Sequence, residues 1–182
     1  MTELLTKKFT IEEFLALPND GTRYELVEGE LLEMPGASEL HSRISNRLSY
    51  YLTGFVLTNK LGEVSNSDAR YAIFPGSETV RMADVSFVQT DRVTRGVVTM
   101  NFAPDLAVEV LSESNGAIEI EKKAKAYLRA GGVLVWVINP EEQEVYIYRA
   151  GELQRQTLTV TDELRGDPVL PGFKLPVSPL FE

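Results

Sequence analysis

The chain has 182 residues, of which 43% are hydrophobic and 25% are charged, and it contains no cysteine. This length predicts one domain over residues 1–182, large enough to fold around a core without disulfide bonds. The absence of cysteine excludes a disulfide framework, a thiolate metal site and a thiol nucleophile. The single histidine, His41, excludes a zinc site built from several histidines of one chain.

Charge and hydropathy narrow the class of protein further. The 18 Lys and Arg residues against 27 Asp and Glu give a net charge of −9. This excess of negative charge argues against nucleic-acid binding through bulk charge, but it does not exclude a local basic cleft. No apolar run reaches the ~18 residues of a membrane span, and the start of the chain does not resemble a secretory signal. We therefore expect a cytoplasmic protein without a membrane partner.

The first third of the chain predicts a short helix, a hairpin and a long helix. A capping box opens a short helix over 10–17. Two β-forming runs, 23–27 and 30–34, flank Glu28-Gly29 and predict a hairpin. Apolar residues then recur at every third or fourth position over 38–58, the spacing of an amphipathic helix.

The remainder of the chain predicts strands around one further helix. The predicted strands cover 63–74, 81–88, 105–111, 133–138, 145–148 and parts of 152–160. A helix is expected over 116–129, ended by Gly131-Gly132. The Pro-rich end is expected to lie on the surface as an extended tail. This order of elements predicts an α/β fold with a mixed central sheet between helices.

Two acidic residues stand where buried strands are expected. Glu109 interrupts the apolar run 106–111, and burying an ionised carboxylate is costly unless it is paired or bound to a cation. An edge strand open to solvent, or an arginine partner, would also explain it. Asp84 opens the β-forming run 84–88, where a turn residue at the strand start is the alternative. Because neighbouring strands can bring both side chains to one sheet edge, the pair predicts an oxygen-ligand site for Mg²⁺.

The helix over 116–129 carries a lysine at the margin of its apolar face. Lys123 lies next to Tyr127 on the helical wheel, between the apolar arc and the solvated one. An i, i+4 ion pair with Glu119 is the structural alternative for this lysine. A lysine angled toward two strand carboxylates is also the arrangement that phosphodiester hydrolysis uses.

Four segments together resemble a known family. The runs 23–31, 84–88, 106–112 and 123–127 follow one another as in the large bacterial family of putative restriction endonucleases, a former domain of unknown function. That family belongs to the PD-(D/E)XK nuclease superfamily, and the similarity covers about 9–181. The resemblance implies a restriction-endonuclease-like α/β/α sandwich with a mixed central sheet and a Mg²⁺-dependent phosphodiesterase site.

The resemblance also implies which residues form the site. Asp84 and Glu109 match the two metal-binding acids, and with the backbone carbonyl of Val110 they are expected to hold Mg²⁺ or Mn²⁺. The lysine that usually follows the second acid by two residues is Leu111 here. Lys123 occupies the place on the next helix from which relatives supply that lysine, and we expect it to orient or deprotonate the attacking water.

Three further residues belong to this pattern. Glu25 matches a recurrent acid of the hairpin and is expected to be a further metal or water ligand. His41 matches a histidine at the start of the long helix, where contact with substrate, proton transfer and a structural role all remain open. Tyr127 is either a phosphate ligand or, more commonly at such a position, a core tyrosine.

The predicted function is that of a Mg²⁺-dependent endonuclease that hydrolyses DNA. A homodimer is expected, because two sites related by a two-fold axis can cut both strands of a duplex. The basic residues expected to hold DNA are Arg43, Arg47, Lys60, Arg70, Arg92 and Arg95. Two alternatives remain: a catalytically silent binding or regulatory module that kept the fold, and an enzyme acting on RNA or a nucleotide.

Overall fold

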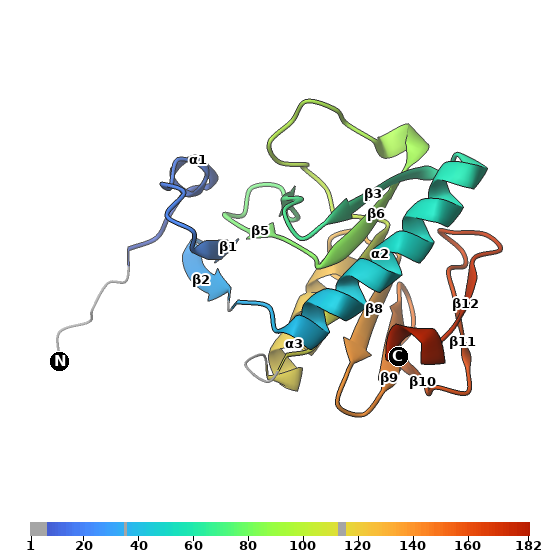
Figure 1. Ribbon diagram of the computed structural model, residues 1–182. Helices are drawn as coiled ribbons and strands as arrows, with labels where there is room; N and C mark the ends of the chain where they lie inside the picture. Colours follow the sequence, from blue (N-terminus) through green and yellow to red (C-terminus); the bar gives the residue numbers. More distant parts are fainter. Residues whose placement is uncertain (1–6, 35, 113–115) are drawn as a thin grey trace.

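The computed structural model of the protein describes residues 7–34, 36–112 and 116–182. The first six residues, part of the segment compared with a secretory signal above, lie outside the described residues. Helix α2 (Glu39–Asn59) crosses one face of the central sheet, and helix α3 (Ala117–Arg129) lies against the other face (Figure 1). The α/β/α sandwich that the sequence predicts is therefore present.

The central sheet is mixed and joins six strands of the described residues in the order β10-β9-β8-β7-β6-β3. These strands are β3 (Gly62–Asn66), β6 (Val85–Gln89), β7 (Leu106–Val110), β8 (Leu134–Asn139), β9 (Glu144–Arg149) and β10 (Gln156–Leu158). Strands β7 and β8 run parallel, whereas each other neighbouring pair in this sheet is antiparallel. Helix α3 makes the crossover that two parallel strands require.

A smaller antiparallel sheet joins four short strands in the order β2-β1-β5-β4. These strands are β1 (Arg23–Val27), β2 (Glu30–Met34), β4 (Tyr71–Ala72) and β5 (Val80–Arg81). The predicted hairpin is confirmed, because β1 and β2 pair through Glu28-Gly29, with positive φ at both residues. Such a turn matches the right-handed twist of the two strands. Helix α1 (Ile11–Leu15) begins with the predicted capping box and packs Phe14 against this sheet.

Helix α2 is built as its periodicity predicts. The Ser38 side chain accepts a hydrogen bond from the His41 backbone N–H and so caps the helix N-terminus. Four apolar residues at intervals of four face the sheet and are almost fully buried: Ile44, Leu48, Leu52 and Val56. None of the helices that the structure describes combines the length and the apolar character of a membrane span.

Two predicted strands are each divided between the two sheets. The predicted strand 81–88 is wrong as one element, because β5 pairs with β1 in the small sheet and β6 pairs with β3 in the central sheet. The chain passes from one sheet to the other at 82–84, and this places Asp84 at the entry to β6. The predicted strand 63–74 divides in the same way into β3 and β4.

The C-terminal segment is not the surface tail that its prolines suggest. It contains a hairpin of β11 (Glu163–Arg165) and β12 (Lys174–Pro176), followed by the turn η2 (Ser178–Leu180). The fully buried residues in this segment are Leu164, Leu170, Val177 and Leu180. They join the core on the α2 face of the sheet, where Phe173 stacks on Trp136 at a ring distance of 6.0 Å. The apolar residues between the prolines outweigh the surface signal, because each buried side chain contributes roughly 1.5–3 kcal/mol.

Two glycines offer a matched test of this packing. A Cβ at Gly62 would lie 2.0 Å from the Val88 backbone oxygen, whereas a Cβ at Gly54, within α2, meets nothing within 4 Å. We expect Gly62→Ala to lower the free energy of unfolding by about 1–3 kcal/mol through overpacking. Gly54→Ala is expected to raise it by about 0.5–1 kcal/mol through helix propensity. Urea denaturation of both variants measures the difference, and equal stabilities would contradict the β3–β6 packing.

Candidate active site

The two strand acids lie at the same edge of the central sheet. Val85 of β6 pairs with Val108 of the antiparallel β7, so the start of β6 lies beside the end of β7. Asp84 precedes β6, and Glu109 is the penultimate residue of β7. Since Val108 belongs to the core on the α2 face, the alternation of side chains along β7 directs Glu109 toward α3. The sheet therefore brings Asp84 and Glu109 together, as their places in the sequence predict.

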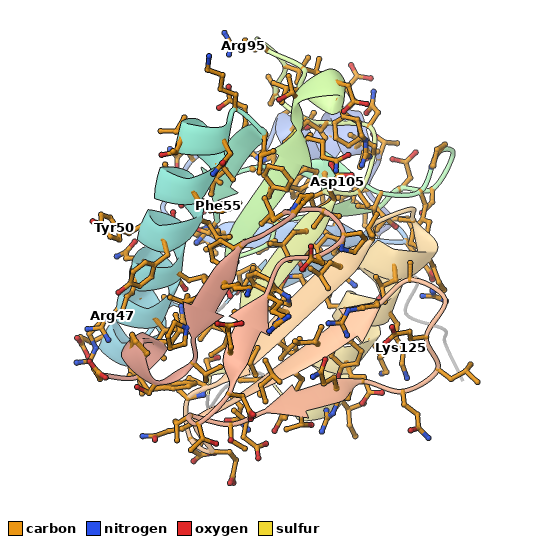
Figure 2. All side chains as sticks on the ribbon, turned by 90° about the vertical axis from the view of Figure 1, so that its right-hand side faces the viewer. Arg47, Tyr50, Phe55, Arg95, Asp105 and Lys125 are labelled. Carbon is orange, nitrogen blue, oxygen red and sulfur yellow. The ribbon has the colours of Figure 1, made fainter. Side chains whose placement is uncertain are left out.

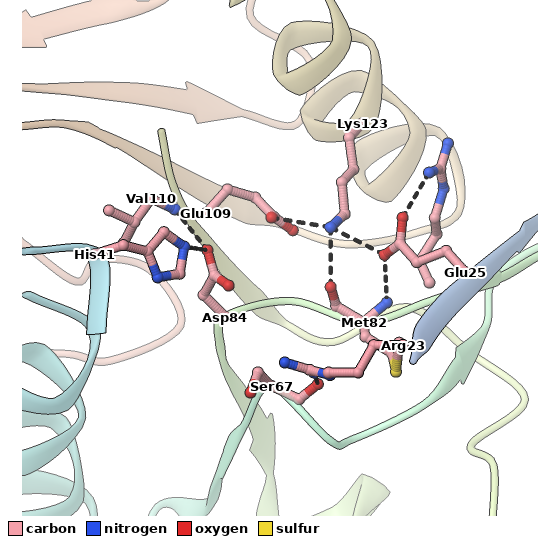
Figure 3. Close-up of polar contacts among 10 residues, drawn as sticks. Arg23, Glu25, His41, Ser67, Met82, Asp84, Glu109, Val110 and Lys123 are labelled. Atoms are coloured by element: carbon pink, nitrogen blue, oxygen red, sulfur yellow. Dashed lines mark hydrogen bonds and ion pairs between the residues drawn. The ribbon is translucent and has the colours of Figure 1, made fainter. Parts of the chain in front are cut away.

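Lys123 on α3 reaches the buried Glu109 carboxylate. Its Nζ lies 2.9 Å from Glu109 Oε2, 2.9 Å from Glu25 Oε1 and 2.9 Å from the Met82 carbonyl oxygen (Figure 3). All three ammonium hydrogens thus have acceptors. Burial lowers the pKa of Lys123, but the nearby carboxylates outweigh it and hold that pKa above its ordinary value. The alternative i, i+4 pair is not formed, because Glu119 bonds Lys122 at 3.0 Å instead.

Glu25 on β1 is fully engaged by neighbouring donors. Its Oε1 accepts a hydrogen bond of 2.7 Å from the Met82 backbone N–H and also contacts Lys123, and its Oε2 lies 2.7 Å from Arg81 Nη1. Burial raises the pKa of Glu25, but the charges of Lys123 and Arg81 outweigh it and hold that pKa below its ordinary value. Glu25 therefore positions Lys123 and has contacts on both oxygens, and its part as a metal or water ligand stays a prediction.

Asp84 is fixed by contacts to one of its two oxygens. Its Oδ2 accepts a 2.7 Å hydrogen bond from the Val110 backbone N–H and lies 3.1 Å from His41 Nε2 (Figure 3). Burial raises the pKa of Asp84, but the hydrogen bond and charge of His41 outweigh it and hold that pKa below its ordinary value. Its Oδ1 accepts no hydrogen bond from the residues that the structure describes. His41 thus orients Asp84 from the first turn of α2.

Asp84 and Glu109 border a small cleft of about 30 Å³, which His41 and Arg23 also line. Glu109 Oε1 is buried and has no hydrogen-bond partner among the described residues. Burial raises the pKa of Glu109 to about 8 against the pull of Lys123, and the negative charges of Asp84 and Glu25 act with burial. A buried carboxylate oxygen without a partner beside a second acid is a place where a cation would be stabilised.

The residues of the cleft fit a magnesium ion more closely than a zinc ion. Within residues 7–34, 36–112 and 116–182, no three His, Cys, Asp or Glu side chains form a group that could hold a metal. Mg²⁺ is commonly bound through one or two carboxylates while it keeps several waters, and it prefers oxygen ligands. The free oxygens of Asp84 and Glu109 meet that requirement, whereas a closed zinc site needs four protein ligands.

Sequence reasoning missed Arg81 and the Met82 backbone, which hold Glu25 in place. A signal was present, since an acid within the β-forming run 23–27 needs a cationic partner if it is buried. Tyr127 lies in the core on the α3 face and is fully buried, and its hydroxyl has no partner among the described residues. Burial raises the pKa of Tyr127 well above its ordinary value. Tyr127 therefore occupies the position of a core tyrosine.

Two of the basic residues expected to hold DNA, Arg47 and Arg92, make contacts within the fold. Arg47 donates to the Pro179 carbonyl oxygen at 2.9 Å and so attaches α2 to the C-terminal turn. Arg92 forms an ion pair with the buried Asp105. Figure 2 shows Arg47 and Arg95 far apart, with Arg95 at the top of the view and Arg47 beside the lower part of α2. The six basic residues do not form one cluster, and their contact with DNA stays a prediction.

The Glu25 carboxylate gives a test of the buried network. We expect Glu25→Gln to lower the free energy of unfolding by about 3–5 kcal/mol at pH 7, because Arg81 loses its buried anionic partner. Glu25 has a folded-state pKa below its ordinary value of 4.5, so its contribution to the free energy of unfolding is complete above pH 4.5. The contribution is lost as the pH falls through the folded-state pKa. The difference between wild type and variant should therefore shrink below about pH 4.

Glu30→Gln is the matched control, measured by the same urea titrations. Glu30 belongs to the same hairpin and lies 2.8 Å from Lys8 Nζ, but both side chains of that pair are more than half exposed. Its loss should change stability by no more than about 0.5 kcal/mol. Equal effects of the two substitutions would show that burial does not set the strength of the Glu25 contacts.

Comparison with known proteins connects this site to a family. The Uma2 model, described as "Putative restriction endonuclease", matches residues 11–178. The fold is similar to that of a putative nuclease belonging to DUF820 from Anabaena variabilis ATCC 29413, with a TM-score of 0.84, 22% identity, and coverage of 95% of this chain and 97% of that one. No curated protein matched the chain. Because the Uma2 match extends from α1 to η2, the chain belongs to the Uma2 family of putative restriction endonucleases.

Proposed function

We propose that the protein is a Mg²⁺-dependent endonuclease that hydrolyses phosphodiester bonds of DNA. The observation that carries this proposal is that Asp84 and Glu109 border one small cleft, with Glu109 Oε2 held by the buried Lys123 and Glu109 Oε1 buried and unpartnered among the described residues. Membership of Uma2 and the likeness to a putative nuclease support the class of reaction. The metal and the substrate are our inference from the chemistry of these side chains.

Asp84, Glu109 and the backbone carbonyl of Val110 would hold the metal, for which Mn²⁺ is a substitute. When bound, such an ion lowers the pKa of a coordinated water and stabilises negative charge on the phosphoryl oxygens. Asp84 presents one oxygen to the cleft while the Val110 N–H and His41 fix the other. The two acids thus arrive in a fixed orientation, which lowers the reorganisation that binding requires.

Lys123 contributes positive charge rather than a base in this proposal. Each of its three hydrogens already has an acceptor, and no lone pair remains to accept a proton. The ammonium group holds the Glu109 carboxylate and can stabilise negative charge that develops at the adjacent phosphate. Deprotonation of water therefore does not fit this arrangement, and orientation of water would require one of the three hydrogens to leave its present acceptor.

A catalytically silent module is the second candidate. It is favoured by the absence, within the described residues, of three side chains already grouped as metal ligands. It is also favoured by the small volume of the cleft, about 30 Å³. A protein of this kind would bind nucleic acid or a partner without cutting it, since a fold does not determine a function.

Cleavage assays with matched variants distinguish the two candidates. We expect the wild type to cleave plasmid or duplex DNA with Mg²⁺ or Mn²⁺, and EDTA to abolish cleavage. Asp84→Asn and Glu109→Gln should each lower the rate about 10²–10³-fold by removing charge at the metal. Calorimetric titration with Mn²⁺ should show weaker binding to both variants, a readout that does not depend on activity.

The exposed Glu163 on β11 provides the control for these charge changes. Glu163→Gln should leave both cleavage and Mn²⁺ binding unchanged, because Glu163 lies outside the cleft. Cleavage that survives Asp84→Asn and Glu109→Gln would show that the site is elsewhere. A wild type that binds no Mn²⁺ and cleaves neither DNA nor RNA would support the silent module, and cleavage of RNA alone would correct the substrate.

We also propose that two copies act together on duplex DNA. A two-fold axis would place one catalytic cleft at each strand. Light scattering should then give a mass near twice the 20.3 kDa of the chain, alone or with DNA bound. A mass of one chain under both conditions would contradict the dimer and leave single-strand nicking as the expected reaction.

A further inference from the structure

Arg23, the first residue of β1, lines the catalytic cleft but has no part in the buried ion-pair network. It borders the cleft together with Asp84, Glu109 and His41, and it is the one arginine or lysine among the described lining residues. Figure 3 shows its guanidinium pointing away from Glu25 and Lys123, toward Ser67 on the side of Asp84. The side chain is 45% exposed, so it is accessible to a ligand from solvent.

The contacts of Arg23 leave most of its hydrogen-bond donors available. Nη2 donates to the Ser67 backbone oxygen and lies 3.4 Å from Asp68 Oδ1. The Asp68 side chain is 96% exposed, and such an ion pair with a solvated partner contributes little. Nε and Nη1 donate to no described residue, although a guanidinium carries five N–H donors. The hydrogen bond to the Ser67 oxygen fixes the direction of the guanidinium group and leaves most of its N–H donors available.

The other cations near the cleft are committed to carboxylates. Lys123 uses all three of its hydrogens on Glu25, Glu109 and Met82, and Arg81 bonds Glu25. A phosphodiester that enters the cleft meets the two acids of the site, whose negative charge opposes it at short range. A cation on the substrate side is therefore needed in addition to any metal.

We propose that Arg23 holds the phosphate backbone of the nucleic-acid substrate at the mouth of the cleft. The planar fork of an arginine matches two oxygens of a phosphate, which a lysine cannot engage in the same geometry. This assignment rests on the proposed nuclease function and adds a substrate-positioning residue to it. The Arg23 guanidinium contacts the substrate in this proposal, whereas the buried Lys123 contacts the carboxylates of Glu25 and Glu109.

The experiment compares Arg23→Gln with Arg23→Lys and with the control Arg165→Gln. Gln keeps an N–H₂ group for the Ser67 oxygen, and Lys keeps the charge without the fork. Arg165 on β11 is also exposed and also pairs with one acid, Glu163, at 3.1 Å. Each protein is tested for cleavage of a duplex oligonucleotide with Mg²⁺, and for binding of the same duplex in EDTA at several salt concentrations.

Arg23→Gln should lower kcat/KM about 10–100-fold, mainly through a higher KM, because a charge-assisted contact to substrate is lost. The slope of log Kd against log salt should fall in magnitude by about one, the amount expected for one phosphate contact. Arg23→Lys should keep the wild-type slope and recover only part of kcat/KM. Arg165→Gln should match wild type in both measurements.

Three results would overturn the assignment. An active wild type with unchanged KM and salt slope in Arg23→Gln removes the role of Arg23 but leaves the proposed function intact. Equal losses in Arg23→Gln and Arg165→Gln would indicate a general effect of charge rather than a contact. A wild type that neither binds nor cleaves DNA or RNA overturns the proposed function, and the assignment with it. Thermal unfolding tests whether each variant is folded. If Arg23→Gln is unfolded, the assignment is decided by Arg23→Lys, which keeps the charge and should recover only part of kcat/KM.

Discussion

The buried ammonium group of Lys123 is the constraint on which the site depends. An unpaired ammonium at 5% exposure would be strongly destabilising, so the fold must bring acceptors to it from several elements. Glu25 comes from the small sheet, Glu109 from the central sheet, and the Met82 carbonyl from the passage between them. One cation thus joins both sheets and α3, and the geometry of the cleft follows from the same contacts that hold these layers together.

When all three carboxylates of this network are ionised, its charges do not balance within the protein. Three carboxylates, those of Glu25, Asp84 and Glu109, surround the two cations Lys123 and Arg81, with His41 beside Asp84. Glu25 is satisfied on both oxygens, so the remaining negative charge is concentrated on the two acids that border the cleft. Burial is the first cause of the raised pKa of Glu109, and the negative charges of Asp84 and Glu25 raise it further. A divalent cation between these two acids would compensate the charge that the protein leaves unpaired.

The sequence predicts the acids better than their surroundings. Glu109 could be identified because an acid in a continuous apolar run needs a partner, and the strand order places Asp84 beside it. The capped helix α2 and the Glu28-Gly29 hairpin were equally accessible, since local turn and capping chemistry determines them. The passage between sheets at 82–84 was not, because Asp84 can indicate where a strand starts but not which sheet each neighbouring strand joins. The role of Arg81 depends on that passage and was missed for the same reason.

The replacement of the usual strand lysine by Leu111 explains why Glu25 belongs to this site. A residue two positions after Glu109 points to the same face of the sheet, and Leu111 there packs into the core beneath α3. Because α3 covers that face, a lysine on the helix can reach the Glu109 carboxylate from above, and Lys123 does so at 2.9 Å. A lysine side chain loses rotamer entropy when its ammonium group is held in one position. Glu25 and the Met82 carbonyl offset that cost by holding the ammonium group on its other side, so moving the lysine to the helix makes the hairpin acid a structural requirement of the site.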